Sequence, residues 1–283
     1  MARSDWRRPK DFSAPEGRRR VALEVSYDGR QFCGWQSQID EKSVQDTIKE
    51  AVTRLVGDRN VQIVGSGRTD SGVHAYGQVA HAEFDSCDIP VKAFYAGLNS
   101  ILPSGVRIRR SWDVDRSFHA RYSAMAREYR YFCKVGEGRD CFSDGLVTVI
   151  KTFPDFDLLN GYAKEIVGTH DFSTFTSAKD DCPSKVRDIY ESDFSWTQST
   201  YGEKVLCYRI CGNAFLYHMV RSLVGTMLEM GQNSLPVQDF VDALEAKDRS
   251  RAGKTASPDG LYLWRVSYDE DEFKWFEEEY GKR

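Results

Sequence analysis

The order of its strand-like and helix-like segments is what most constrains how this chain can fold. Strand-like segments carry apolar residues at every second position, and helix-like segments carry them at spacings of three and four. In the first 115 residues these segments follow one another as strand, helix, strand, strand, helix, strand. They are residues 21–27, 44–55, 61–64, 79–84, 91–101 and 106–110. This order predicts a ferredoxin-like unit.

The second half of the chain shows a similar mixture with weaker patterns. Strands are expected at 127–135, 186–194, 204–211 and 260–268, and helices at 156–167 and 215–230. Asn213 is the expected N-cap of the last helix. The pattern therefore predicts an α+β fold built from two halves that share one large sheet.

Charge and pattern together divide the chain into four parts. A basic arm of residues 1–19 precedes an N-terminal α+β half (20–115), a C-terminal α+β half (116–268) and an acidic tail (269–283). The net charge of −4 argues by itself against a nucleic-acid partner. However, residues 104–134 hold eight Arg or Lys against three acids, with aromatic residues between them. That combination is typical of RNA or single-stranded DNA binding, and equally of a solvated protein face.

The composition also indicates where the protein is located in the cell and which chemistry it can use. No apolar run is long enough to span a membrane, and the first residues lack the apolar centre of a secretory signal. Seven cysteines without a CxxC pair indicate neither a disulfide framework nor a zinc ribbon. The five histidines lack the spacing of helical metal ligands, so no metal is expected. These features predict a cytoplasmic protein without a membrane segment.

The sequence GSGRTDSGVHAYGQVAHAEF, residues 65–84, is the first candidate for a functional site. Its four glycines raise the entropic cost of ordering a loop, and ordered loops of that cost often carry function. It lacks the GK[ST] ending of a phosphate-binding loop. What remains is Asp70 near Arg68, a cation that favours an ionised, nucleophilic carboxylate. The alternative is an ordinary hairpin connection.

Two further positions allow both a structural and a functional interpretation. Arg221 follows Tyr217 by one turn in the expected helix, where an exposed surface arginine is the simpler interpretation. Tyr129 lies in an expected strand, where a buried tyrosine is more often part of the core than of a catalytic site. The residues alone leave both questions open.

Five ordered blocks of the sequence are similar to a known family. They are YDGRQFCGWQSQ (27–38), GRTDSGVHAYGQVAH (67–81), FHARYSAMAREYRY (118–131), GNAFLYHMVRSLVG (212–225) and AKDRSRAGKTASPDGLYL (246–263). The chain resembles the TruA-type tRNA pseudouridine synthases from about Val21 to Tyr268. The resemblance implies the pseudouridine synthase fold, in which two ferredoxin-like halves share a mixed, mostly antiparallel β-sheet.

The resemblance assigns a role to each candidate residue. It implies that Asp70 is the catalytic aspartate and that Arg68 helps to displace the target base. Tyr129 then stacks on that base, Arg221 pairs with the aspartate, and Leu261 lines the pocket. Small departures from the family pattern do not remove a reacting group; they are Ser71 in place of the usual alanine and Ser222 in place of a common asparagine.

The resemblance also implies the activity. A cofactor-free, homodimeric isomerase would convert uridine to pseudouridine in the anticodon arm of tRNA, near positions 38 to 40. Two other classes compete with this interpretation. A non-catalytic RNA-binding protein would use the same basic and aromatic surface but would not need the four polar candidates together. An aspartate-dependent metal hydrolase is disfavoured by the histidine spacing.

Overall fold

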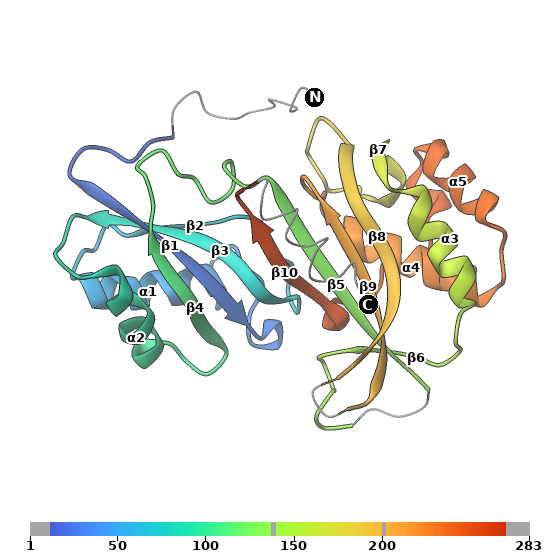
Figure 1. The fold of residues 1–283 in the computed structure, drawn as a ribbon, viewed down its shortest axis with the longest axis horizontal. Coiled ribbons are helices and arrows are strands. Elements are labelled where there is room, and N and C mark those ends of the chain that lie inside the picture. Colours follow the sequence, from blue (N-terminus) through green and yellow to red (C-terminus); the bar gives the residue numbers. More distant parts are fainter. Residues whose placement is uncertain (1–11, 137–139, 200–201, 270–283) are drawn as a thin grey trace. The chain divides into compact units, whose positions relative to one another are not determined.

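The computed structural model describes residues 12–136, 140–199 and 202–269 of the chain. The chain divides into two compact units. The N-terminal unit comprises Met1–Met125 together with Leu263–Arg283, and the C-terminal unit comprises Ala126–Tyr262. Each unit has its own sheet strands and its own helices (Figure 1).

The N-terminal unit has the predicted ferredoxin-like order. Its elements are β1 (Arg18–Tyr27), α1 (Val44–Val56), β2 (Gln62–Gly65), β3 (His74–Asp85), α2 (Val91–Ile101) and β4 (Val106–Asp113). The strand order is β4-β1-β3, with β2 on the other side of β3, and the three pairs are antiparallel. The six-element prediction is confirmed.

Local signals explain the limits of the first helix. Ser43 caps α1, since its side-chain oxygen accepts a hydrogen bond from the Asp46 backbone N–H at 3.0 Å. Gly57 ends the helix in the left-handed conformation, at φ 75°. Between them the apolar stripe of α1, which includes Val44, Ile48 and Val52, is buried.

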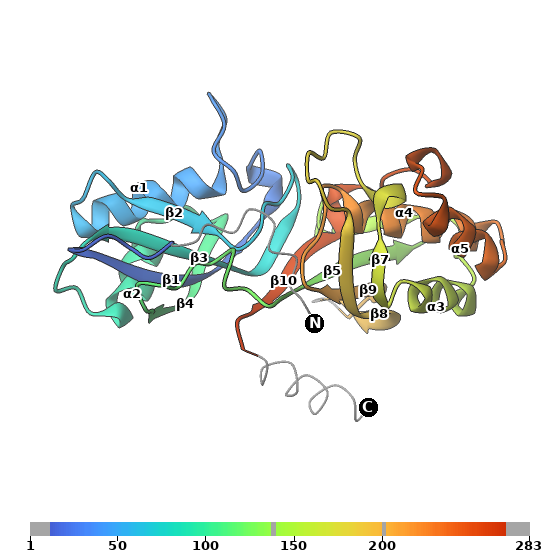
Figure 2. The same cartoon turned by 90° about the horizontal axis from the view of Figure 1, so that it is seen from above.

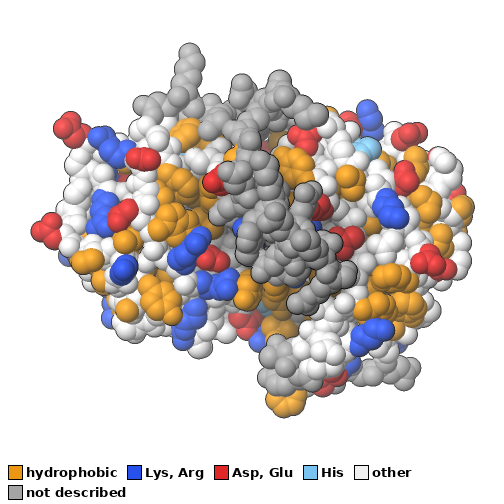
Figure 3. All heavy atoms as spheres, viewed as in Figure 1, with side chains coloured by type: hydrophobic (Ala, Val, Ile, Leu, Met, Phe, Trp, Pro, Cys, Tyr) orange, Lys and Arg blue, Asp and Glu red, His pale blue; other side chains and the backbone are white. Residues whose placement is uncertain are grey.

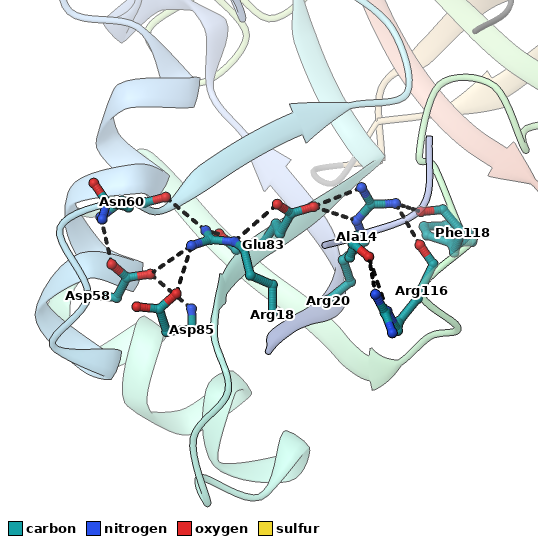
Figure 4. Close-up of polar contacts among 9 residues, drawn as sticks. All are labelled: Ala14, Arg18, Arg20, Asp58, Asn60, Glu83, Asp85, Arg116 and Phe118. Carbon is teal, nitrogen blue, oxygen red and sulfur yellow. Dashed lines mark hydrogen bonds and ion pairs between the residues drawn. The ribbon is translucent and has the colours of Figure 1, made fainter. Parts of the chain in front are cut away.

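An ion-pair network joins neighbouring strands β1 and β3 of the N-terminal sheet (Figure 4). Arg20 is 7% exposed; its guanidinium lies 2.7 Å from the Glu83 carboxylate and donates to the backbone oxygens of Arg116 and Phe118. Arg116 in turn donates to the Ala14 carbonyl. Arg20 and Arg116 therefore hold protein segments together, although Arg116 lies in the basic region 104–134 of the sequence.

The C-terminal unit is also α+β. Its elements are β5 (Ala126–Val135), β6 (Thr148–Ile150), α3 (Phe156–Glu165), β7 (Gly168–Asp171), β8 (Val186–Gln198), β9 (Lys204–Gly212), α4 (Met219–Gln232) and α5 (Val237–Ala246). Strands follow the order β5-β9-β8-β7 in antiparallel pairs, while β6 pairs with β5 in parallel. The predicted α+β class and the mixed, mostly antiparallel pairing are confirmed.

The helices of the C-terminal unit lie together on one side of its strands (Figure 2). Their buried side chains include Leu159, Tyr162 and Phe240, whose ring lies 5.4 Å from that of Tyr162. Burying a side chain of this size stabilises a fold by about 1.5–3 kcal/mol. The last strand, β10 (Leu261–Ser267), begins in the C-terminal unit and ends in the N-terminal unit.

The start of α4 differs from the prediction. Asn213 does not cap this helix, because its side-chain amide donates to the Asp188 carboxylate and its amide oxygen accepts from the Asp188 N–H. The helix begins instead at Met219, after His218 in the left-handed conformation with φ 65°. Residues 215–218 thus form a loop, and Tyr217 is exposed in it. The sequence patterns also missed α5.

Within the described ranges, no helix has the length and apolar content needed to cross a bilayer.

Candidate active site

Arg68 and Asp70 lie in the loop that joins β2 to β3. The strands on both sides pair antiparallel, with Gly65 opposite Ala80. The loop closes in a turn, because the Val73 N–H donates to the Asp70 carbonyl at 3.1 Å and Gly72 takes φ 79°. Asp70 is half-buried and Arg68 is exposed. The carboxylate is therefore presented at the tip of a loop with firmly attached ends.

The segment before α1 forms one support of this loop. The Thr69 carbonyl accepts from the Trp35 N–H at 3.1 Å, and the Thr69 hydroxyl lies 2.8 Å from the buried Tyr27 hydroxyl. A Cβ atom at Gly34 would lie 2.6 Å from the Thr69 carbonyl oxygen, and Gly34 has φ 117°. A Cβ at Gly65 would lie 2.5 Å from the Trp35 ring. Glycine permits both close approaches.

A buried side-chain pair forms the other support. The Ser66 hydroxyl donates to the Gln78 amide oxygen at 2.6 Å, and the Gln78 amide nitrogen donates to the Gly67 carbonyl at 3.0 Å. Ser66 and Gln78 are both buried. Their satisfied hydrogen bonds fix the chain just before Arg68, since a buried polar group left without a partner would cost about 1–3 kcal/mol.

The histidines near the loop have structural roles. His74 is buried, and its Nδ1 accepts from the Gly29 N–H at 3.1 Å. His81 Nδ1 accepts from the Ala120 N–H at 3.1 Å, and burial lowers the pKa of His81 to about 3. His81 is thus neutral at ordinary pH. Within the described residues, no group of three His, Cys, Asp or Glu side chains is arranged to hold a metal ion.

Tyr129 lies in β5 of the C-terminal unit. It is 7% exposed, and its ring packs edge-on against Phe215, with ring centres 5.0 Å apart. Phe215 belongs to the loop before α4. Tyr129 is therefore supported by the same loop that leads to Arg221.

Arg221 is not an exposed surface arginine, so the simpler interpretation of this residue is wrong. It is half-buried in the first turn of α4, and its Nε donates to the Ala256 carbonyl at 2.8 Å. The Ala256 N–H donates back to the Arg221 carbonyl at 3.1 Å. A Cβ at Gly225 would lie 1.8 Å from the Lys254 carbonyl oxygen, so the helix and the segment before β10 touch through their backbones.

Leu261 begins β10 and is 5% exposed. The segment before it is held by Tyr131, whose hydroxyl donates to the Ser257 carbonyl at 2.8 Å and lies 2.6 Å from the Thr148 hydroxyl. Burial raises the pKa of Tyr131, which keeps it a neutral donor. Gly260 allows the chain to approach the Phe132 carbonyl, since a Cβ there would lie 2.6 Å from that oxygen.

The candidate residues thus fall into two groups. Arg68 and Asp70 share one loop of the N-terminal unit, while Tyr129, Arg221 and Leu261 lie on β5, α4 and β10 in the C-terminal unit. The pairing of Asp70 with Arg221 stays a prediction. Supporting residues that sequence reasoning missed are Tyr27, Trp35, Gln78 and Tyr131. The family-like blocks contain all four, but no pattern within those blocks distinguishes a supporting residue from a core residue.

Comparison with known proteins identifies the class of enzyme. A model of the tRNA pseudouridine synthase family matches residues 24–123 and 162–269, which include Asp70, Arg221 and Leu261. Tyr129 lies between the two matched ranges. The chain is an isomerase of the pseudouridine synthase class.

Individual relatives match over nearly their whole length. A protein named tRNA pseudouridine synthase A from Bacillus subtilis is 41% identical over 88% of this chain and 99% of its own. Proteins of that name from a Geobacillus strain and from Treponema denticola are 40% and 38% identical, over 89% and 92% of this chain and 99% and 96% of their own. The chain belongs to the tRNA pseudouridine synthase family.

Proposed function

We propose that this protein converts uridine to pseudouridine in the anticodon stem-loop of tRNA, at positions 38 to 40, with Asp70 as the nucleophile. The observation that carries the proposal is the Asp70 loop, which is anchored on both sides and lies within the part of the chain that matches the family. We also propose that the enzyme acts in the cytoplasm as a homodimer and needs no cofactor.

The reaction is an isomerisation, so every atom of the nucleotide is retained. The Asp70 carboxylate attacks C1′ of the ribose, the bond from N1 to C1′ breaks, and the uracil leaves with the electron pair, as a sugar leaving group does in glycoside hydrolysis. The uracil then turns, and its C5 forms a bond to C1′ while the bond to Asp70 breaks. C5 loses its proton, and N1 gains one. An ionised carboxylate suits this role because it is a nucleophile without prior deprotonation.

The remaining candidates act on the base and on the carboxylate. A base within a stem must leave the stack before its C1′ can be reached. Arg68 is exposed beside Asp70, so it can occupy the space that the flipped base leaves. Tyr129 offers a ring for the flipped base. Arg221 supplies the positive charge that holds Asp70 ionised, and Leu261 contributes an apolar wall to the pocket.

The decisive experiment maps pseudouridine in tRNA after incubation with the purified protein. We expect new pseudouridine at one or more of positions 38 to 40, and none when Asp70→Asn replaces the parent. Transcripts with cytidine at these three positions serve as the control and should stay unmodified. Modification elsewhere would disprove the proposed site, and modification by Asp70→Asn would disprove the nucleophile. The mass of the protein in solution tests the dimer.

A further inference from the structure

Two irregularities in the N-terminal sheet bring arginine and aromatic side chains together near the Asp70 loop. In β4, Arg110 pairs with Glu24 and Ile108 pairs with Val25, so Arg109 is an extra residue between them. Successive residues of a regular strand point to opposite faces, and a bulge changes this. As a result both arginines reach the same carboxylate: Arg109 lies 3.0 Å and Arg110 3.6 Å from the oxygens of Glu24.

A second bulge re-aims the start of β3. Val25 of β1 pairs with Gln78 and Tyr27 pairs with Ala75, so β3 has two residues, Tyr76 and Gly77, where β1 has one. A Cβ at Gly77 would lie 2.6 Å from the Trp264 carbonyl oxygen, so the backbones of β3 and β10 touch here. This contact brings Trp264 beside Tyr76, the third residue of β3.

The result is a stack of three planar groups. The rings of Tyr76 and Trp264 are 4.4 Å apart and inclined by 12°, and the Arg109 guanidinium lies 3.9 Å from the centre of the Tyr76 ring. Arg110 lies over the Trp112 ring at 4.6 Å. We refer to Tyr76, Arg109, Arg110, Trp112 and Trp264 as the stacked surface.

The stacked surface is open to solvent. Tyr76 is 44% exposed, and the side chains of Arg109 and Arg110 are 34% and 64% exposed. Two other arginines of the basic region hold backbone carbonyls. Arg107 donates to the carbonyls of residues 102, 103 and 106, and Arg127 donates to that of Asn213. Arg109 and Arg110 thus form a basic pair stacked on aromatic rings; Arg109 also donates to the Tyr76 carbonyl at 3.2 Å, and Glu24 orients both side chains and leaves a net positive charge.

We propose that the stacked surface binds unpaired nucleotides of the RNA substrate beside the modified site, an inference that rests on the proposed function. Exposed arginines recognise phosphate through several planar N–H donors, and aromatic rings and guanidinium planes stack on bases. Figure 3 shows Lys and Arg side chains beside hydrophobic side chains on a face of the N-terminal unit. The surface holds the RNA strand while Asp70 acts on the target nucleotide.

The test measures tRNA affinity and turnover of full-length variants. Tyr76→Ala should weaken tRNA binding by about tenfold, because it removes the ring from the centre of the stack. Tyr95→Ala is the matched control, since Tyr95 is 50% exposed on α2 of the same unit, and its affinity should stay within about twofold of the parent. Tyr76→Phe keeps the stack and should bind like the parent. For Tyr76→Ala we expect a raised KM and an unchanged kcat.

Substitutions of the two arginines test the contributions of charge and of stacking separately. Arg109→Lys keeps the charge but loses the planar group, and it should weaken binding nearly as much as Arg109→Gln. Arg110→Gln should lower the slope of log affinity against log salt by about 0.7–0.9, whereas Arg54→Gln on α1 should leave the slope unchanged. Thermal unfolding of each variant shows whether its fold is retained. If Tyr76→Ala proves unstable, the salt slope of Arg110→Gln still tests the stacked surface.

The outcomes of the two proposals are distinct. Parent-like affinity and salt slope in Tyr76→Ala, Arg109→Gln and Arg110→Gln would overturn the stacked surface, even if the parent forms pseudouridine. A parent that forms no pseudouridine in any tRNA would overturn the proposed function, whatever the variants bind.

Discussion

The loop that carries Asp70 and the helix that carries Arg221 are held in place in different ways. The Asp70 loop is held by contacts to its neighbouring residues: Tyr27 holds the Thr69 hydroxyl, the Trp35 N–H holds the Thr69 carbonyl, and Gln78 holds Ser66 and Gly67. Arg221 depends on the backbone of a distant segment, with which it exchanges two hydrogen bonds at Ala256. The supports of Asp70 therefore act on the loop around it, whereas the support of Arg221 acts directly on the guanidinium.

This difference predicts how each site responds to substitution. The Asp70 loop has supports at Ser66, Gly67 and Thr69 that do not involve the Asp70 side chain, so a change at Asp70 should affect chemistry more than structure. A guanidinium that is itself a structural donor cannot be removed so cleanly, and a change at Arg221 should affect chemistry and local structure together. Four substitution experiments test this contrast.

The largest effect is expected for Asp70→Asn. The amide has nearly the same shape but no negative charge for attack on C1′, so turnover should fall more than about a thousandfold. The thermal midpoint and tRNA affinity should stay close to those of the parent, because Ser66, Gly67 and Thr69 make contacts that support the loop. Tritium release from tRNA labelled at C5 of uridine measures turnover, thermal denaturation measures the midpoint, and filter binding measures tRNA affinity.

The control for that experiment is Asp115→Asn, an exposed carboxylate of the same unit. It should retain parent turnover. If Asp70→Asn also unfolded at a clearly lower temperature, the idea that the loop is supported independently of its carboxylate would be wrong.

Arg221→Met should lower turnover roughly a hundredfold at neutral pH. Methionine preserves much of the side-chain packing, but the proposed counter-ion of Asp70 is lost. Raising the pH should restore part of the activity, because a larger fraction of the carboxylate is then ionised. The lost hydrogen bond to Ala256 should also reduce the free energy of unfolding by about 1 kcal/mol. A pH–rate profile identical to that of the parent would disprove the pairing with Asp70.

Local sequence signals predicted much of the fold, and the reason is physical. The strand and helix order of the N-terminal unit follows from periodicity, and the structure adds that Ser43 and Gly57 limit α1. These signals act over a few residues. The start of α4 was not predictable in this way, because Asn213 forms its hydrogen bonds with Asp188 rather than with the helix. Asn213 has the side chain of a good N-cap, but that side chain forms its hydrogen bonds with Asp188 of β8.

The same limit applies to the candidate site. The Gly-rich loop pointed to Asp70, because its four glycines raise the entropic cost of ordering the loop, and ordered loops of that cost often carry function. Arg221 had no local signal that separated it from a surface arginine, and its partner Ala256 is 35 residues away. Tyr131 and Ser257 are 126 residues apart. Only the resemblance to a family pointed to this region, and contacts of such range cannot be read from periodicity.

Two glycine substitutions test the backbone contacts of the two regions. Gly225→Ala should lower the free energy of unfolding by about 2–3 kcal/mol, because its Cβ would meet the Lys254 carbonyl at 1.8 Å. Gly34→Ala should cost a similar amount, through its contact with Thr69 and its φ of 117°. Denaturant unfolding measures both values.

Gly17→Ala is the matched control for strain without crowding. Gly17 has φ 79°, and no atom lies within 4 Å of a Cβ built there. It should therefore show only the backbone cost, about 1 kcal/mol. Equal losses for Gly17→Ala and Gly34→Ala would mean that crowding of Gly34 against Thr69 adds nothing to the backbone cost.

The smallest effects are expected for Tyr27→Phe and Tyr131→Phe, which remove one hydroxyl from each region. Each change leaves the ring in place and should cost about 0.5–1.5 kcal/mol of stability. Their effects on turnover should differ. Tyr27 acts on Thr69, next to the nucleophile, and its loss should lower kcat several-fold with tRNA affinity unchanged. Tyr131 holds Ser257, next to the residue that accepts from Arg221, so its loss should reproduce in weaker form the pH-dependent defect of Arg221→Met.

Combining Tyr131→Phe with Arg221→Met should then add little to the single Arg221→Met defect, because both act through one segment. Fully additive losses in turnover would show that Tyr131 and Arg221 act separately, and that the segment before β10 does not link them.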